Sequence, residues 1–263
     1  MLLIVPTANG LRLGPPPAAT LLIAALILMV AAWSLPGVAR LRGERAQIEE
    51  VLRSSQAGET IVAGTSTQEL GALRRAALGA DLAALDARDP LRNWGYTRDG
   101  TAWRAVTALF VHADWLHLAV NWIPLLVLGA CLEQVWGSLC VLGLFLAGGT
   151  ASMLLDASLG PPGLIVGSSG AVATLLGACA VRFRSRPVRW RYAYFDALRL
   201  RRGKFEIPVA LLVGLWLLQQ VTGLFAPPPA SGIAFVSHLG GFALGAAYAA
   251  ARTAARAATP APA

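Results

Sequence analysis

The stretch GSSGAVATLLGACAV, residues 167–181, joins a tight polar turn directly to an uncharged apolar segment. Gly167 and Gly170 flank two serines and allow a close turn, which leaves a serine hydroxyl and its own backbone amide at the start of a helix. The N-terminus of a helix favours negative charge. The turn alone is a weak indication of a reactive serine, because glycine and serine are common wherever helices meet in membranes.

The chain around this turn is apolar enough to lie in a membrane. Of its 263 residues, 56% are hydrophobic and 14% are charged, and the mean hydropathy is +0.59. A helix needs about 20 apolar residues to cross a bilayer. We therefore expect an all-α membrane protein with a bundle of six transmembrane helices and a long first loop. The expected spans are Ala18–Val38, Trp115–Leu132, Leu139–Leu155, Ser169–Val181, Ile207–Leu224 and Gly232–Ala251.

The first of these runs also fits a secretory signal peptide. It follows a single arginine, Arg12, and Ala31-Ala32-Trp33 is a poor version of a small-x-small cleavage site. The poor site favours a retained span.

The basic residues predict the orientation of the spans. Nine of them lie between the fourth and fifth runs, which by the positive-inside rule places that loop in the cytoplasm. Successive spans alternate in direction, so both termini should be cytoplasmic and residues 39–114 should lie outside. The formal net charge of +8 then reflects orientation, and we expect the lipid bilayer and no nucleic acid as a partner. The nine residues are Arg182, Arg184, Arg186, Arg189, Arg191, Arg199, Arg201, Arg202 and Lys204.

The sequence indicates a single domain over residues 1–263. Its parts are a cytoplasmic N-terminus (1–17), an extracytoplasmic loop insertion (39–102), a core (103–251) and a cytoplasmic tail (252–263).

Two segments of the insertion, Arg40–Arg53 and Thr67–Leu85, have helical composition and are separated by the Gly/Ser/Thr-rich stretch Ser54–Ser66. An amphipathic helix on the membrane surface and a loosely ordered insertion both fit this pattern.

All three histidines lie in or beside expected spans, where ionisable groups are costly and usually functional. His117 and Asn121 are four residues apart, so both project from one face of a helix. His238 stands in SHLGGFALG, residues 237–245, where Gly241 and Gly245 would let two helices approach closely. A serine with a histidine beside it is a nucleophile with its base. The expected topology places both near the outer half of the bilayer.

Together these pieces resemble the rhomboid family of intramembrane serine proteases, of the bacterial six-span type. The resemblance runs from Trp103 to Gly245. It rests on Trp103-Arg104, the series His112, His117 and Asn121, the GxSG turn, and His-x-x-Gly-x-x-x-Gly. Either serine of the turn could be the nucleophile on chemistry alone, and the family pattern selects Ser169. It implies a Ser169–His238 catalytic dyad without a carboxylate.

The resemblance also assigns the residues around the dyad. The Ser169 amide, His117 and Asn121 would form an oxyanion hole, and Glu133 resembles a structural acid of the family. The supporting residues it implies are His112, Gly167, Gly170, Gly241 and Gly245.

Two positions depart from the family pattern. An aromatic residue that often stacks on the histidine is replaced by Ala173, and a common alanine before the histidine is Ser237. What orients His238 is therefore open.

The implied activity is an endopeptidase that cuts transmembrane proteins near the extracytoplasmic face of a bacterial cytoplasmic membrane. No cofactor or metal is expected, because Cys131, Cys140 and Cys179 look like packing residues. The loop Phe225–Gly232 resembles a cap over the site. A catalytically quiet rhomboid-like protein that binds membrane helices is the main alternative, and a small transporter is a weaker one because paired acids at mid-membrane are absent. The oligomeric state and the physiological substrate are not predicted.

Overall fold

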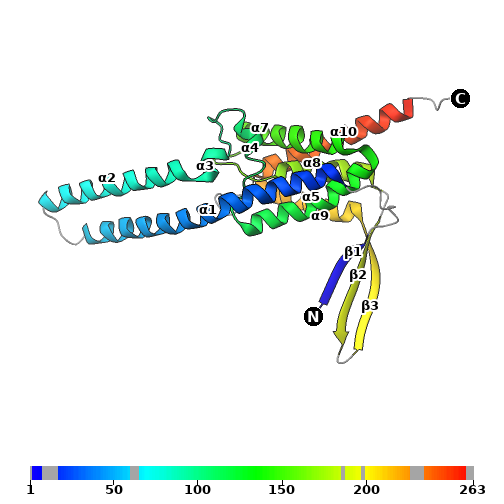
Figure 1. Ribbon diagram of the computed structural model, residues 1–263, viewed down its shortest axis with the longest axis horizontal. Coiled ribbons are helices and arrows are strands. Elements are labelled where there is room, and N and C mark those ends of the chain that lie inside the picture. Colours follow the sequence, from blue (N-terminus) through cyan, green and yellow to red (C-terminus); the bar gives the residue numbers. More distant parts are fainter. Residues whose placement is uncertain are drawn as a thin grey trace.

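The computed structural model describes residues 2–7, 17–59, 65–184, 187–196, 199–225 and 234–258, and this part of the chain is mostly helical (Figure 1). Its helices are α1 (Ala18–Glu59), α2 (Thr65–Arg88), α3 (Pro90–Trp94), α4 (Arg104–Thr107), α5 (Trp115–Trp136), α6 (Ser138–Gly143), the π-helical turn η1 (Leu144–Gly148), α7 (Gly149–Leu159), α8 (Ser169–Arg182), α9 (Val209–Leu224) and α10 (Phe235–Ala258). Its strands are β1 (Leu2–Thr7), β2 (Pro187–Asp196) and β3 (Arg199–Pro208).

Three helical stretches among the described residues are long and apolar enough to cross a membrane. They are the first 37 residues of α1, all of α5, and the continuous helix formed by α6, η1 and α7. The helices α8 and α9 are apolar but shorter. Large apolar side chains of α5 and α9, such as Leu116 and Leu218, are exposed, as expected for residues that face lipid. The protein is thus a membrane protein, and the complete six-span bundle stays a prediction.

The first helix is longer than its apolar run. The sequence predicts a span that ends at Val38, but α1 has 42 residues and runs from Ala18 to Glu59. Charged residues one turn apart pair along this extension, as in Arg40–Glu44 (3.4 Å) and Arg45–Glu49 (3.8 Å). Such pairs favour continued helix.

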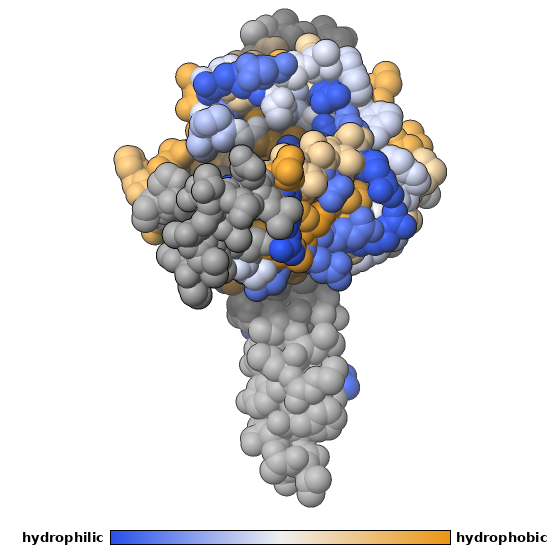
Figure 2. Space-filling view, turned by 90° about the vertical axis from the view of Figure 1, so that its left-hand side faces the viewer, coloured by the Kyte–Doolittle hydropathy of each residue, from blue (hydrophilic) through white to orange (hydrophobic). Residues whose placement is uncertain are grey.

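The second helix of the insertion packs back along the first, so that α1 and α2 project together beyond the bundle (Figure 1). Asp86 of α2 forms ion pairs with Arg45 and, at 3.1 Å, with Arg92. The described part of the insertion is therefore an ordered helical hairpin. Seen from the end toward which this hairpin projects, the coloured residues are hydrophilic toward the top and right, and hydrophobic residues show at both rims and near the centre (Figure 2).

The expectation of an all-α protein is wrong for the basic loop. Strands β2 and β3 form an antiparallel hairpin, and β1 adds to its edge in the order β1-β2-β3. The sequence Val188-Arg-Trp-Arg-Tyr-Ala-Tyr194 alternates apolar and other residues with the period of two that is typical of strands. The positive charge of the loop indicates its orientation but not this strand pattern.

Helix α8 is the most enclosed helix at the centre of the bundle. Apart from its ends it consists of small residues and leucines, and it packs against α10, α5, η1 and α7. Small side chains let these neighbours approach its backbone closely. The turn that precedes α8 is consequently held at a fixed place relative to α5 and α10. The buried residues of α8 are Gly170, Ala171, Ala173, Thr174, Leu175, Gly177, Ala178 and Cys179.

Near the C-terminal end of α5, Glu133 caps the N-terminus of α1. Its carboxylate accepts hydrogen bonds from the backbone amides of Ala19 (2.8 Å) and Thr20 (2.9 Å), from the Thr20 hydroxyl (2.7 Å) and from the Ser138 hydroxyl (2.6 Å). The first amides of a helix lack intrahelical partners, and a negative charge beside them is favourable. The structural acid suggested by the sequence thus ties the first span to the second.

We expect Glu133→Gln to lower the free energy of unfolding by about 1–3 kcal/mol, because an amide cannot accept all four hydrogen bonds. Thermal unfolding in detergent would measure the loss. Glu44→Gln, which removes one partner of an exposed ion pair, is the matched control and should change stability by less than about 0.5 kcal/mol. Equal effects of the two substitutions would contradict the capping role.

Candidate active site

The turn before α8 is held by backbone hydrogen bonds to two distant segments. Tyr96 and Ile165 exchange amide–carbonyl hydrogen bonds of 2.9 and 2.8 Å, and the amide of Gly167 donates to the carbonyl of Ala108 at 2.8 Å. Gly167 has a φ of +103°, and a methyl group on it would lie 2.7 Å from the ring of His117. Only glycine combines this backbone angle with so close an approach.

The two serines of the turn occupy different environments. Ser168 is the N-cap of α8 and is fully buried. Its amide donates to Nε2 of His112 at 3.4 Å, and its hydroxyl lies 3.3 Å from the same nitrogen. Ser169 is the first residue of α8 and is partly exposed. Of the two serines, Ser169 is therefore the more accessible one.

The ring of His112 holds the turn through its contacts with Ser168. It is fully buried, and its Nδ1 donates to the carbonyl of Phe110 at 3.3 Å while Nε2 accepts from Ser168. Burial, together with the neighbouring His117, lowers the pKa of His112 to about 4. The ring is consequently neutral at neutral pH, as its one donor and one accepting nitrogen require.

His117 and Asn121 lie one turn apart near the start of α5, as their spacing predicts. The N-cap residue Asp114 accepts from the amide of His117 at 2.8 Å. Nδ1 of His117 accepts from the amide of Ala113 at 3.4 Å, which leaves the ring proton on Nε2, the nitrogen that faces Gly167. The Asn121 amide donates to the carbonyl of His117 at 2.8 Å. The Nε2–H of His117 thus lies beside Gly167 of the serine turn, whereas the Asn121 amide is engaged within α5. A place for Asn121 in an oxyanion hole stays a prediction.

Helices α8 and α10 pack closer than any residue with a side chain would allow at three positions. A methyl group on Gly241 would overlap the carbonyl oxygen of Gly170, and one on Gly245 would overlap that of Thr174. Likewise, a methyl group on Gly177 would overlap the backbone of α10. This contact brings the first turn of α8, which holds Ser169, against the first turns of α10.

His238 lies in the first turn of α10 and is surrounded by residues that the sequence did not single out. Its Nδ1 is 2.7 Å from Oε1 of Gln220 on α9. The ring of Trp216, also on α9, lies 6.3 Å from the His238 ring at an interplanar angle of 34°, and Phe235 lies 6.5 Å away. Among the described residues no hydrogen bond joins Ser169 to His238. The sequence offered only a weak signal for α9: the pair Gln219–Gln220 interrupts a mostly apolar run, but it does not show which glutamine faces His238.

A buried acid of α7 caps the helix that carries His238. The carboxylate of Asp156 accepts from the amide of Ser237 at 2.9 Å, and the Ser237 hydroxyl donates to that of Ser152 at 3.2 Å. Asp156 and Ser237 are both almost fully buried. These contacts tie the start of α10 to α7. The alanine common at this position would keep the amide contact with Asp156 but lose the hydroxyl contact with Ser152.

Asp156→Ala should leave the Ser237 amide buried without its acceptor, which costs about 1–3 kcal/mol. We expect a lower midpoint of thermal unfolding in detergent. Asp156→Asn keeps an accepting oxygen of the same reach and should recover most of the loss. Equal stability of the alanine variant and the parent would show that the contact does not hold α10.

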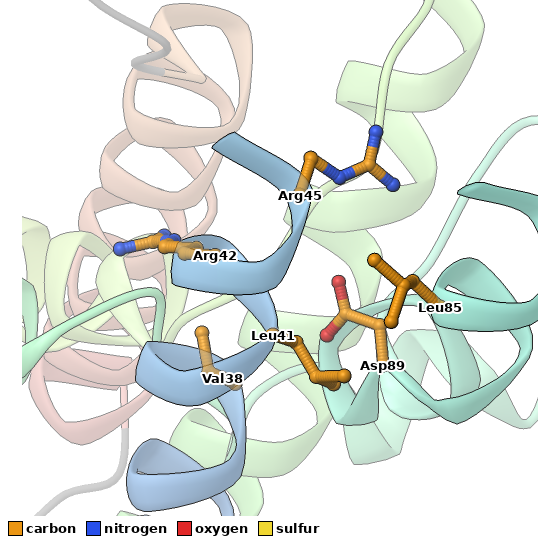
Figure 3. A pocket seen from close by; sticks show the side chains of 6 residues that line it. All are labelled: Val38, Leu41, Arg42, Arg45, Leu85 and Asp89. Carbon is orange, nitrogen blue, oxygen red and sulfur yellow. The ribbon is translucent and has the colours of Figure 1, made fainter. Parts of the chain in front are cut away.

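A small cavity in the described part of the chain lies apart from these groups. It is between α1 and the end of α2, and its lining residues are Val38, Leu41, Arg42, Arg45, Leu85 and Asp89 (Figure 3). Asp89 is already engaged as the N-cap of α3, where it accepts from the amide of Leu91. This lining offers no nucleophile, so the candidate site stays at the α8–α10 contact.

The chain is similar to several known proteins of one family. A family model described as "Rhomboid domain" matches residues 99–254, more than half of the chain. Rhomboid-like protease 5 of Toxoplasma gondii is 37% identical over 107 residues, which cover 38% of this chain and 11% of that protein. RHOMBOID-like protein 6, mitochondrial, of Arabidopsis thaliana is 34% identical over 113 residues (43% and 36%). Human Rhomboid-related protein 3 is 30% identical over 145 residues (54% and 34%).

The chain thus matches only about a third or less of the length of these relatives. All three come from eukaryotes. The bacterial six-span type and the bacterial membrane stay predictions.

Proposed function

Because the chain belongs to the rhomboid family, we propose that it is an intramembrane serine endopeptidase whose nucleophile is Ser169 and whose base is His238. The packing of α8 against α10 is the observation that carries the proposal, because it sets the partly exposed serine of the turn beside the helix turn that holds His238. A catalytically quiet family member would need neither group.

The chemistry is acyl transfer. Oγ of Ser169 attacks a peptide carbonyl while Nε2 of His238 takes the hydroxyl proton, and the same nitrogen then gives that proton to the leaving amine. Water, activated by His238, releases the acyl group from Ser169. The Ser169 amide, Nε2 of His117 and the Asn121 amide would donate to the developing oxyanion. Loss of one such donor typically costs about 10²–10³-fold in turnover.

The proposed spans are α1, α5, the helix from α6 to α7, α8, α9 and α10, with the site toward the extracytoplasmic end. The start of α1, the basic β-hairpin and the end of α10 lie at one end of the bundle (Figure 1), as expected if that end is cytoplasmic. Near the other end, Trp33, Trp94 and Trp103 form a chain of edge-to-face contacts at 6.3 and 6.0 Å. Tryptophans are enriched at both membrane–water interfaces, so these three support a membrane boundary at the base of the 39–102 insertion. The side follows from the basic loop at the other end.

The substrate would be a transmembrane helix cut near its extracytoplasmic end. The carbonyls of a helix are engaged in internal hydrogen bonds, so the substrate must unwind locally to present one to Ser169. Residues that destabilise helices, such as glycine, should therefore favour cleavage. The expected cap, Phe225–Gly232, lies almost wholly outside the described residues.

The test is cleavage of single-span substrates by the purified protein in liposomes, combined with fluorophosphonate labelling. The substrates should vary in glycine content near their extracytoplasmic end. We expect cleavage there, and covalent labelling that mass spectrometry maps to Ser169. Absence of both cleavage and labelling across the series would refute the proposal.

A further inference from the structure

Helix α9 presents two side chains to His238. Trp216 and Gln220 are four residues apart and so lie one above the other on the same helix face. The Trp216 ring packs, tilted, beside the rings of both His238 (6.3 Å between centroids, 34°) and Phe242 (5.8 Å, 35°). Gln220 is 3% exposed, although glutamine is rarely so buried in an apolar helix. Its neighbour Gln219 is exposed, so only one of two consecutive glutamines faces inward.

The contact between Gln220 and His238 fixes which ring nitrogen carries the proton. An amide oxygen only accepts, so a 2.7 Å contact between Oε1 of Gln220 and Nδ1 of His238 requires the proton on Nδ1. Nε2 then holds a free lone pair. A general base needs this tautomer, because the nitrogen that takes the serine proton must begin without one.

We propose that Gln220 is a positioning residue that holds His238 in the tautomer and ring orientation of a general base. The inference rests on the proposed function. It answers what orients the ring where Ala173 offers no aromatic face: an acceptor on α9 fixes Nδ1, and Trp216 packs beside the ring.

A neutral acceptor also sets the strength of the base. A carboxylate at this place would stabilise the imidazolium and raise the pKa of the ring, whereas an amide oxygen does so less. Glutamine therefore orients the base without adding a charge to a site enclosed by apolar helices, where an unpaired charge is costly.

The first test compares Gln220→Leu, Gln220→Glu and the control Thr222→Val in the liposome cleavage assay. Gln220→Leu should lower kcat about 10-fold or more with little change in KM. The substitution removes the contact that orients the base, but it leaves the contacts of the substrate in place. The loss should stay below the 10²–10⁴-fold that general-base catalysis itself contributes. Gln220→Glu restores an acceptor of equal length and should recover most of the turnover at neutral pH. Thr222→Val removes a polar group from an exposed residue of the same helix, whose hydroxyl donates to carbonyls of α9 itself, and should stay within about threefold of the parent. Gln219 is unsuitable as a control because it accepts a hydrogen bond from the side-chain amide of Gln220.

The second test is the pH profile of kcat/KM, which a purely structural role would not move. Gln220→Glu should shift the acidic limb to higher pH by about one pH unit, since a carboxylate favours the protonated ring. The titratable groups around His238 are His117 on α5, which interacts with it electrostatically, and Asp156 on α7, bound to the adjacent amide. Both are unchanged in these variants, so the shift would belong to the contact on α9.

The outcomes separate this inference from the proposed function. Ser169-dependent cleavage with unchanged kcat and pH profile in both Gln220 variants would overturn the inference and leave the protease assignment intact. A loss of kcat in Gln220→Leu that follows only a lower unfolding midpoint, without rescue or a pH shift in Gln220→Glu, would also overturn it. A parent protein that neither labels nor cleaves would overturn both.

Discussion

Ser169→Ala should abolish cleavage, with a fall in turnover of about 10⁴-fold or more, as is typical when the nucleophile of a serine hydrolase is removed. Ser168→Ala should retain cleavage within about 10-fold. Ser168 is fully buried and its amide, which the substitution keeps, already binds His112. Its lost hydroxyl contact with His112 should cost about 1 kcal/mol of stability.

The pair is measured by substrate cleavage in liposomes and by the rate of fluorophosphonate labelling, with thermal unfolding to confirm that both variants fold. Labelling should vanish in Ser169→Ala and persist in Ser168→Ala. The reverse result, at unchanged stability, would assign the chemistry to Ser168 and require the turn to open. Persistent cleavage in both variants would remove the serine mechanism altogether.

The serine turn shows how far sequence reasoning reaches. The pattern GxSG and the family resemblance select Ser169, and the burial of Ser168 now gives a physical reason for the same choice. Gln220 was not predicted, because its role depends on which face of α9 meets α10, and an apolar helix with one polar pair does not reveal that. The contact joins residues 18 positions apart on different helices.

The fold was predictable where one pattern dominates and was missed where two patterns overlap. The span formed by α5 could be predicted from its hydropathy. In α1 the apolar run ends near Val38 but the helix does not, because helix formation in the extension depends on charge pairs such as Arg40–Glu44 and on packing against α2. In β2 the arginines that indicate orientation also alternate with Trp190 and Tyr192 in strand period. Reading charge alone therefore predicted a loop.

The second large effect is expected at the α8–α10 contact, on which the whole site depends. Gly245→Ala adds a methyl group that overlaps the carbonyl oxygen of Thr174. The obstacle is backbone, so no side chain can move aside and the helices must separate. We expect a loss of about 3 kcal/mol or more in stability, at the upper end for overpacking a tight interior. Cleavage should fall more steeply than the folded fraction, because separation moves His238 away from Ser169.

Gly214→Ala on α9 is the matched control, since nothing lies within 4 Å of the added methyl group. Both substitutions replace a helical glycine by alanine and gain the same helix propensity, about 1 kcal/mol in soluble helices, so their difference isolates the overlap. Unfolding in detergent and cleavage in liposomes measure the two effects. If Gly245→Ala were as stable and active as Gly214→Ala, α8 and α10 could not be in the close contact that sets Ser169 beside the turn of His238. The dyad would then have to be assembled by the substrate.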